Sequence, residues 1–170
     1  MEALYWSITR GRAMQWSEVV DNPCLENLPF KIELNRYGKI EMTPASNKHG
    51  RLQLQIGALL ERKLKRGEAM IECSIQTTEG VKVADVAWCS KAFIKQHGYE
   101  TPYSSAPEIC IEIVSPSNSK EEIFNKAQLY LHAGAQEAWV VWEDGVTEYY
   151  GKSGNLDRSA YGVAVKFTPT

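Results

Sequence analysis

The feature that most constrains the fold is a glutamate set inside an apolar run. Residues 109–114 read Ile-Cys-Ile-Glu-Ile-Val, so Glu112 is the only charged side chain in that segment. A short, nearly continuous apolar run is typical of a strand that is covered on both faces. The chain is therefore expected to form a sheet with a layer on each side, and Glu112 is expected to be buried in it.

A second acid interrupts the preceding strand-like run. In residues 81–88, which read Val-Lys-Val-Ala-Asp-Val-Ala-Trp, period-two alternation predicts that Asp85 shares a strand face with Val83 and Ala87. Burying a lone carboxylate costs free energy, so each acid is expected to have a partner. Two acids that meet most naturally share a divalent cation.

Length and composition favour one domain. The chain has 170 residues, of which 44% are hydrophobic, and this is enough to bury one substantial core. A formal net charge of −2 gives no global cationic field, so nucleic-acid binding would need a local patch. No run approaches the roughly 20 apolar residues of a membrane span, and the N-terminus has no hydrophobic signal core. We therefore expect a cytoplasmic protein without membrane contact, whose cysteines are reduced.

The pattern of apolar residues and turn formers predicts a mixed α/β order. The expected elements are, in order, a short helix at 16–20, a hairpin at 30–34 and 39–42, a long helix at 47–66 that Gly67 stops, strands at 69–76 and 81–88, a polar loop at 97–106, a strand at 109–114, a helix at 120–133, strands at 139–142 and 147–150, and a closing strand at 160–167. Ser119 and Glu122 have the spacing of a capping box at the start of the second long helix. We divide the single domain 1–170 into a peripheral segment 1–15, a core 16–150 and a C-terminal strand within 151–170.

Several segments, taken in order, resemble one known family. They are His49-Gly50, Ala84-Asp85-Val86-Ala87-Trp88, Glu112-Ile113-Val114-Ser115-Pro116-Ser117, Lys126 followed by Tyr130 and Gly134 at four-residue intervals, and Trp139-Val140-Val141. From about residue 16 to residue 150 the chain resembles the Uma family of putative restriction endonucleases, within the PD-(D/E)XK nuclease superfamily. One residue departs from the family pattern, because Ala84 stands where the family usually has proline before the aspartate.

The resemblance implies a restriction endonuclease-like fold of the α/β (α+β) class, with a mixed β-sheet core flanked by helices. It implies catalytic roles for Asp85, Glu112 and Lys126, and it places Glu33 and His49 at family positions near the site. In the wider superfamily the lysine lies two residues after the glutamate, where this chain has a valine. The resemblance therefore implies that Lys126 reaches the site from the following helix.

Two carboxylates and a lysine suit phosphodiester hydrolysis, whose transition state carries added negative charge. Asp85 and Glu112, with the backbone carbonyl of Ile113, would supply oxygen ligands to magnesium or manganese. A metal there would lower the pKa of a bound water, and Lys126 would position that water or stabilise the phosphoryl oxygens. We therefore predict a magnesium-dependent endodeoxyribonuclease that acts on DNA. The superfamily resemblance, together with the hydrophobic region around residues 139–150, also predicts a homodimer.

Each site residue also has a plain structural alternative. Glu112 could be a core acid bonded to backbone amides, and Asp85 could close a turn. Lys126 lies four residues after Glu122, a spacing that suits a surface ion pair. Glu33 could be a surface charge of the hairpin, and His49 could contact backbone at the start of its helix.

Two other function classes stay open. A catalytically silent nucleic-acid-binding or protein-binding module would keep the fold, although a decayed site would usually have lost one of Asp85, Glu112 and Lys126. A different hydrolase would use the two carboxylates as an acid and base pair, as glycosidases do, but the sequence shows no aromatic-lined sugar motif.

Overall fold

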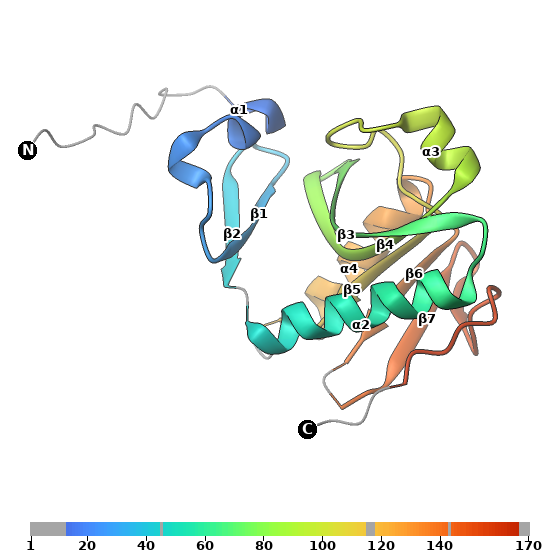
Figure 1. The fold of residues 1–170 in the computed structure, drawn as a ribbon. Helices are drawn as coiled ribbons and strands as arrows, with labels where there is room; N and C mark the ends of the chain where they lie inside the picture. The colour runs from blue at the N-terminus through green and yellow to red at the C-terminus, as the bar shows by residue number, and fades with distance from the viewer. Residues whose placement is uncertain (1–12, 45, 115–117, 143, 167–170) are drawn as a thin grey trace, which may run out of the picture.

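The computed structural model describes residues 13–44, 46–114, 118–142 and 144–166 (Figure 1). Its elements are, in chain order, α1 (Trp16–Val20), η1 (Pro23–Leu25), β1 (Phe30–Leu34), β2 (Ile40–Pro44), α2 (Asn47–Lys63), β3 (Gly67–Thr77), β4 (Gly80–Ser90), α3 (Lys91–His97), β5 (Ile109–Ile113), α4 (Lys120–His132), β6 (Glu137–Val141), β7 (Thr147–Gly151) and β8 (Gly154–Leu156). The expected class, a mixed sheet flanked by helices, is confirmed.

A six-stranded sheet forms the centre of the molecule, in the order β3-β4-β5-β6-β7-β8. β5 and β6 are parallel, and the other neighbouring pairs are antiparallel. The β1-β2 hairpin forms a separate two-stranded sheet that lies beside β4 (Figure 1). β5 is buried along its whole length, as its apolar run predicts.

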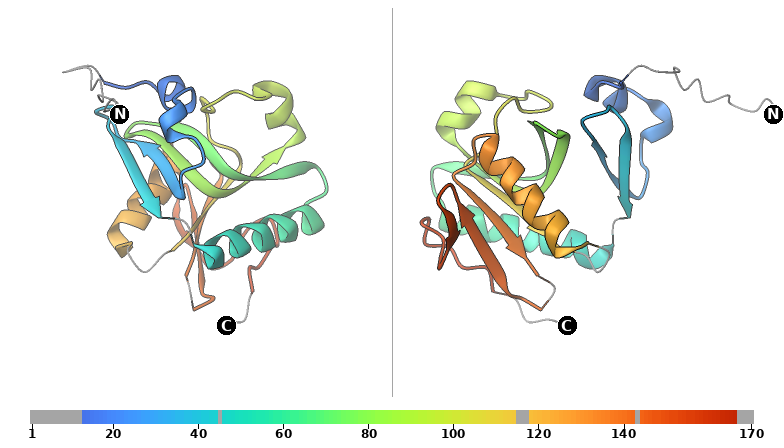
Figure 2. Two further views of the ribbon diagram at one scale, coloured as in Figure 1. Left: turned by 60° about the vertical axis from the view of Figure 1, so that its left-hand side comes forward. Right: turned by 180° about the vertical axis from the view of Figure 1, so that it is seen from behind.

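Helices cover both faces of this sheet (Figure 2). On one face, Leu52, Ile56 and Leu60 of α2 pack in a cluster with residues of β4, β5 and β6. On the other face, Ile123 and Ala127 of α4 pack in a second cluster, to which α3 also contributes. Among the described residues, no helix is long and apolar enough to cross a membrane.

The first long helix ends earlier than predicted. α2 stops at Lys63, with Leu64 as an extended C-cap, whereas the sequence predicted a helix to residue 66 and a stop at Gly67. Gly67 instead begins β3, and a side chain there would collide with the backbone carbonyl of Cys89. The glycine therefore allows two strands to approach closely, which is a tertiary requirement that local sequence does not reveal.

The predicted closing strand at 160–167 is wrong for the residues that the structure describes. The last strand is β8, and residues 157–166 form turns and irregular structure. Val163 and Val165 are nevertheless buried in the cluster beneath α2. Their alternation reflects burial without strand pairing, and period two alone cannot separate the two cases. Phe167 lies outside the described residues.

The second long helix begins as its capping residues predict. The Ser119 side chain accepts the Glu122 backbone N–H at 3.1 Å, and α4 follows from Lys120. This cap fixes the entry of the helix that carries Lys126. The motif serines before it, Ser115 and Ser117, lie outside the described residues.

Candidate active site

One pocket collects most of the polar side chains that the sequence singled out. It has a volume of about 280 Å³ and lies where the β1-β2 hairpin, the start of α2, the strands β4 and β5, and α4 meet. Its charged and amide-bearing lining includes Lys31, Glu33, His49, Gln53, Glu72, Asp85, Glu112 and Lys126. The structure therefore brings together all five side chains proposed from sequence, whose chemical roles stay predictions. Ile113, the proposed backbone ligand, also lines this pocket.

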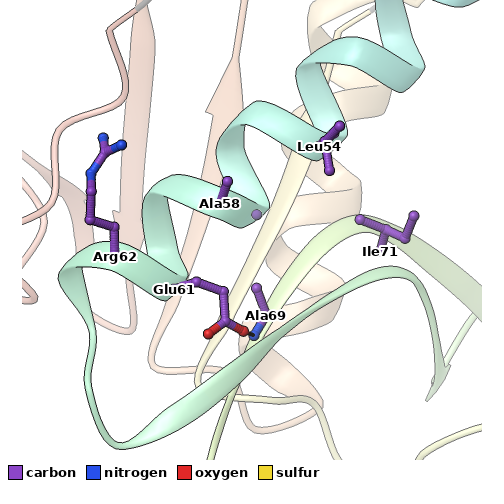
Figure 3. Close-up of a pocket in the computed structure, with 7 residues that line it drawn as sticks. Leu54, Ala58, Glu61, Arg62, Ala69 and Ile71 are labelled. Atoms are coloured by element: carbon purple, nitrogen blue, oxygen red, sulfur yellow. Dashed lines mark hydrogen bonds between the residues drawn. The ribbon is translucent and has the colours of Figure 1, made fainter.

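A larger hollow, of about 620 Å³, lies between α2 and β3 (Figure 3). Its lining is mostly apolar and includes Leu54, Ala58 and Ile71. The carboxylate of its acid, Glu61, accepts the Ala69 backbone N–H at 2.6 Å. Reactive side chains do not converge among the described residues of this hollow, so the smaller pocket is the candidate site.

The regular pairing of the sheet is interrupted on both sides of Asp85. β3 and β4 pair along their length except at Glu72, which would face Asp85. The ladder between β4 and β5 stops one residue before it would pair Asp85 with Glu112. Glu72 also has a positive φ of 53°, an uncommon conformation for a residue with a side chain. Asp85 and Glu112 therefore lie where β4 and β5 stop pairing and separate, a place that we call the fork of the sheet.

Gln53 from α2 fills part of this interruption. Its side-chain amide donates to the Glu72 carboxylate, and to the backbone carbonyl of Asp85 at 3.4 Å. The predicted alternation along β4 also breaks here, because Ala84 and Ala87, three residues apart, pack in the same cluster. A simple period-two assignment of Asp85 to one face is therefore wrong.

Asp85 is nearly inaccessible, with 1% of its side chain exposed, and both of its oxygens have partners. Oδ1 lies 2.6 Å from Nζ of Lys31 and 3.0 Å from Nε2 of His49. Oδ2 accepts the backbone N–H of Ile113 at 2.7 Å. Burial by itself would raise the pKa of Asp85, but the charge of Lys31 and the hydrogen bond to His49 outweigh burial and hold that pKa well below its usual value.

Glu112 is the second buried acid, and its partners come from α4 and from β1. Tyr130 donates its hydroxyl to Oε1 at 2.6 Å. Oε2 lies 3.2 Å from Nζ of Lys126 and 3.5 Å from Nζ of Lys31. Burial raises the pKa of Glu112 above its ordinary value, and attraction to the two lysines does not cancel that effect. Two nearby acids with pKa values shifted in opposite directions are a pattern found at catalytic sites.

Glu33 holds the hairpin to the sheet and also reaches the site. Its Oε1 accepts the Val83 backbone N–H at 2.7 Å and lies 2.7 Å from Nζ of Lys126. Burial would raise the pKa of Glu33, but the attraction of Lys126 and Lys31 lowers it below its usual value. Lys126 thus lies between Glu33 and Glu112, rather than serving as the surface partner that its spacing from Glu122 suggested.

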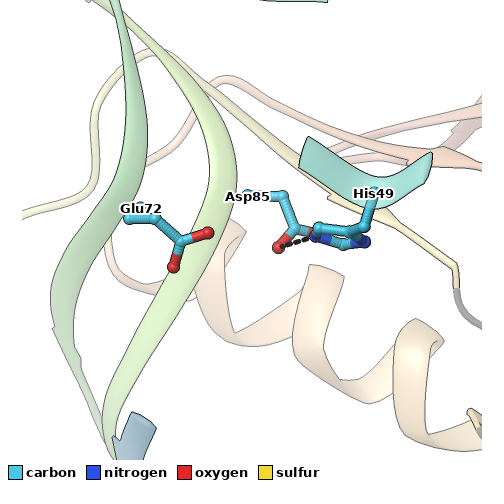
Figure 4. A group of neighbouring side chains, drawn as sticks. All are labelled: His49, Glu72 and Asp85. Carbon is cyan, nitrogen blue, oxygen red and sulfur yellow. Dashed lines mark hydrogen bonds and ion pairs between the residues drawn. The ribbon is translucent and has the colours of Figure 1, made fainter. Parts of the chain in front are cut away.

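His49, Glu72 and Asp85 form a cluster with the chemistry of a metal site (Figure 4). One ligand atom from each lies within 4.8 Å of the others. Ser46 caps α2 by accepting the His49 backbone N–H at 3.1 Å, which places the ring at the helix start. The hydrogen bond to Asp85 raises the pKa of His49, and burial opposes this shift. The backbone of Glu72 and the cap of α2 together direct the two side chains to Asp85.

Sequence reasoning missed three residues of the site. Lys31 lies two residues before Glu33 on β1, so strand alternation could have placed it on the same face. Gln53 lies four residues after His49 on α2, so helical spacing could have linked those two. Glu72 carried no such signal, because its contribution depends on an interruption in strand pairing.

Three comparisons with known proteins bear on this geometry. A family model named Uma2, described as "Putative restriction endonuclease", matches residues 16–164. Among solved structures, the chain is similar to the crystal structure of a putative nuclease belonging to DUF820 from Anabaena variabilis ATCC 29413. That match has a TM-score of 0.60 and 18% sequence identity, and it covers 79% of this chain and 86% of the other. No curated protein matches the chain.

Proposed function

Because the chain belongs to the Uma2 family of putative restriction endonucleases, we propose that the pocket around Asp85 and Glu112 is the active site of a metal-dependent endonuclease that hydrolyses DNA phosphodiester bonds. The observation that carries this proposal is the convergence of Asp85, Glu112 and Lys126, from three different elements, on one pocket. Two acids that can hold a metal and a lysine that can stabilise negative charge suit phosphodiester hydrolysis.

The donor set fits a hard divalent cation. Asp85 and Glu112 present carboxylate oxygens, and one ammonium group already lies within reach of both. Oxygen-rich sites of this kind suit magnesium or manganese, with the Ile113 carbonyl as a further proposed ligand. A bound metal would lower the pKa of a water and neutralise charge on the phosphate. His49, Glu72 and Asp85 offer a second position for a cation.

The residues that contact Glu112 and Lys126 complete the proposal. Tyr130 fixes one oxygen of Glu112, so that the other faces Lys126. Glu33 holds the Lys126 ammonium from the opposite side. Lys126 would orient the attacking water or stabilise the phosphoryl oxygens, as a charged donor held in a water-poor pocket can do. DNA as the substrate, and the expected homodimer, belong to the same proposal.

One observation favours a second function, a catalytically silent nucleic-acid-binding or protein-binding module with the same fold. Lys31, Lys126 and His49 already surround the acids, so the pocket forms a compensated charge network without a metal. Removing one member of such a network leaves a buried charge uncompensated, so the network could persist after catalysis was lost.

Supercoiled plasmid separates the two functions. Wild type should nick or linearise plasmid with magnesium or manganese and leave it intact with EDTA. Asp85→Asn should abolish cleavage, whereas Asp157→Asn, which changes an exposed aspartate in the same way, should not. DNA binding without metal-dependent cleavage by wild type would favour the silent module.

A further inference from the structure

Lys31 holds a position that no other described cation of the pocket holds, because it reaches both acids of the fork. Its Nζ lies 2.6 Å from Oδ1 of Asp85 and 3.5 Å from Oε2 of Glu112. The side chain comes from β1, in the separate hairpin, and only 12% of it is exposed. The ammonium therefore bridges the two carboxylates that would share a divalent cation.

The other contacts of Asp85 decide which partner can leave. Oδ2 accepts a backbone N–H from Ile113 on β5, and the paired strand holds that group in place. Oδ1 is shared by Lys31 and His49. A lysine has a flexible four-carbon stem, so its ammonium can withdraw at the lowest cost in structure.

The contacts of Glu112 also indicate that Lys31 is the partner that can withdraw. Its Oε1 is held by the buried hydroxyl of Tyr130, and its Oε2 is shared by Lys126 and Lys31. Lys126 has a second carboxylate partner in Glu33 at 2.7 Å, which helps to keep it in place. Lys31 is again the partner whose withdrawal leaves the contacts with Tyr130 and Lys126 in place.

We propose that Lys31 is a built-in competitor of the metal: its ammonium occupies the cation position shared by Asp85 and Glu112, and a divalent cation must displace it to bind. A divalent ion and an ammonium group repel each other strongly at such short range in a buried site, so the two exclude one another. The inference rests on the metal-binding part of the proposed function. It adds that Lys31, which the hairpin carries, lowers the affinity of the site for metal and neutralises negative charge on the two acids when no metal is bound.

Manganese titration tests the proposal, with the binding of Mn²⁺ followed by electron paramagnetic resonance of the free ion. Lys31→Met should bind Mn²⁺ at least about fivefold more tightly than wild type, the lower end of typical coupling between two binding events. Lys82→Met is the matched control, because Lys82 is also 12% exposed and pairs with Glu41 outside the pocket. Its affinity should equal that of wild type. Unchanged or weaker binding by Lys31→Met would overturn the proposal, and so would absence of Mn²⁺ binding by both wild type and Lys31→Met.

A second measurement uses wild type alone and covers the case in which Lys31→Met does not fold. Lysines are acetylated by an N-hydroxysuccinimide ester with and without Mn²⁺, and the labelled peptides are quantified by mass spectrometry. Mn²⁺ should increase the labelling of Lys31 and leave that of Lys82 unchanged. Equal labelling of Lys31 in both conditions would contradict displacement. Tighter Mn²⁺ binding by Lys31→Met without plasmid cleavage by wild type would refute the nuclease and leave this inference standing.

Discussion

Tyr130 donates a 2.6 Å hydrogen bond to Oε1 of Glu112, and both residues are almost completely buried. This contact leaves a single oxygen of the glutamate to face the pocket. Tyr130 therefore decides how Glu112 is presented, although it does not line the pocket itself.

Tyr130→Phe should destabilise the protein by about 1–3 kcal/mol, because it leaves a buried carboxylate oxygen without its donor. Denaturant unfolding measures the change. Tyr161→Phe is the control, since the Tyr161 hydroxyl bonds to Gln136 in an exposed position and its loss should cost much less. Equal costs for the two variants would show that the buried hydrogen bond is not the stabilising contact.

Lys126→Ala should lower the rate of plasmid cleavage by about 10² or more, on the order of one lost transition-state donor. Mn²⁺ binding should persist, because lysine is not a ligand. Assays at a temperature well below both melting points separate this effect from instability. Lys82→Ala, which removes a lysine of similar exposure outside the pocket, should cleave like wild type. Comparable activity in both variants would remove Lys126 from the mechanism.

Magnesium or manganese should raise the melting temperature of wild type, because a ligand that binds the native state stabilises it by mass action. Asp85→Asn and Glu112→Gln should both lose that shift. Glu72→Gln should keep most of it, if the metal lies between Asp85 and Glu112. Loss of the shift in Glu72→Gln and Asp85→Asn, with the shift kept in Glu112→Gln, would instead place the cation at the cluster of His49, Glu72 and Asp85.

The contact between His49 and Asp85 should stabilise the protein in a pH-dependent way. The hydrogen bond to Asp85 raises the pKa of His49 above that of a free histidine, about 6.5. Its contribution is therefore complete below that value and is lost as pH rises through the raised pKa of the folded protein. Urea unfolding of His49→Gln should show a larger loss of stability at about pH 6 than at about pH 9.

The matched control for that experiment is His132→Gln, at the exposed end of α4. Its effect on the free energy of unfolding should be small at both pH values. A loss of stability in His49→Gln that does not change with pH would show that the ring contributes packing rather than charge.

The sequence predicted the elements whose burial has a regular period. The run that contains Glu112 became the fully buried β5, and the apolar spacing of Leu52 and Ile56 became the inner face of α2. α3 was missed, because its seven residues make only about two turns, which is too short for a helical period to be recognised. The closing strand was wrong, because Val163 and Val165 are buried without pairing.

The candidate site was predictable only where a residue broke a pattern. Asp85 and Glu112 could be recognised as charges in apolar runs. Lys126 could be recognised because it occupies a motif position in the family that the chain resembles. Lys31 and Glu72 stand in ordinary alternating strands, and their positions follow from the docking of the hairpin and from the positive φ of Glu72. Such contacts join distant segments, so local period and propensity do not encode them.

The hairpin has a consequence for the timing of motion in the protein. It carries Lys31 and Glu33 but pairs only β1 with β2. Its contacts with β4 include the hydrogen bond from Val83 to Glu33, packing of Leu34 with Val81, and the ion pairs of Lys31 with Asp85 and of Glu41 with Lys82. Detaching it breaks fewer contacts than opening the six-stranded sheet, so it can open at a lower free energy than global unfolding. Amide hydrogen exchange of β1 should therefore be faster than that of β5, and its rate would set how often water reaches the two acids.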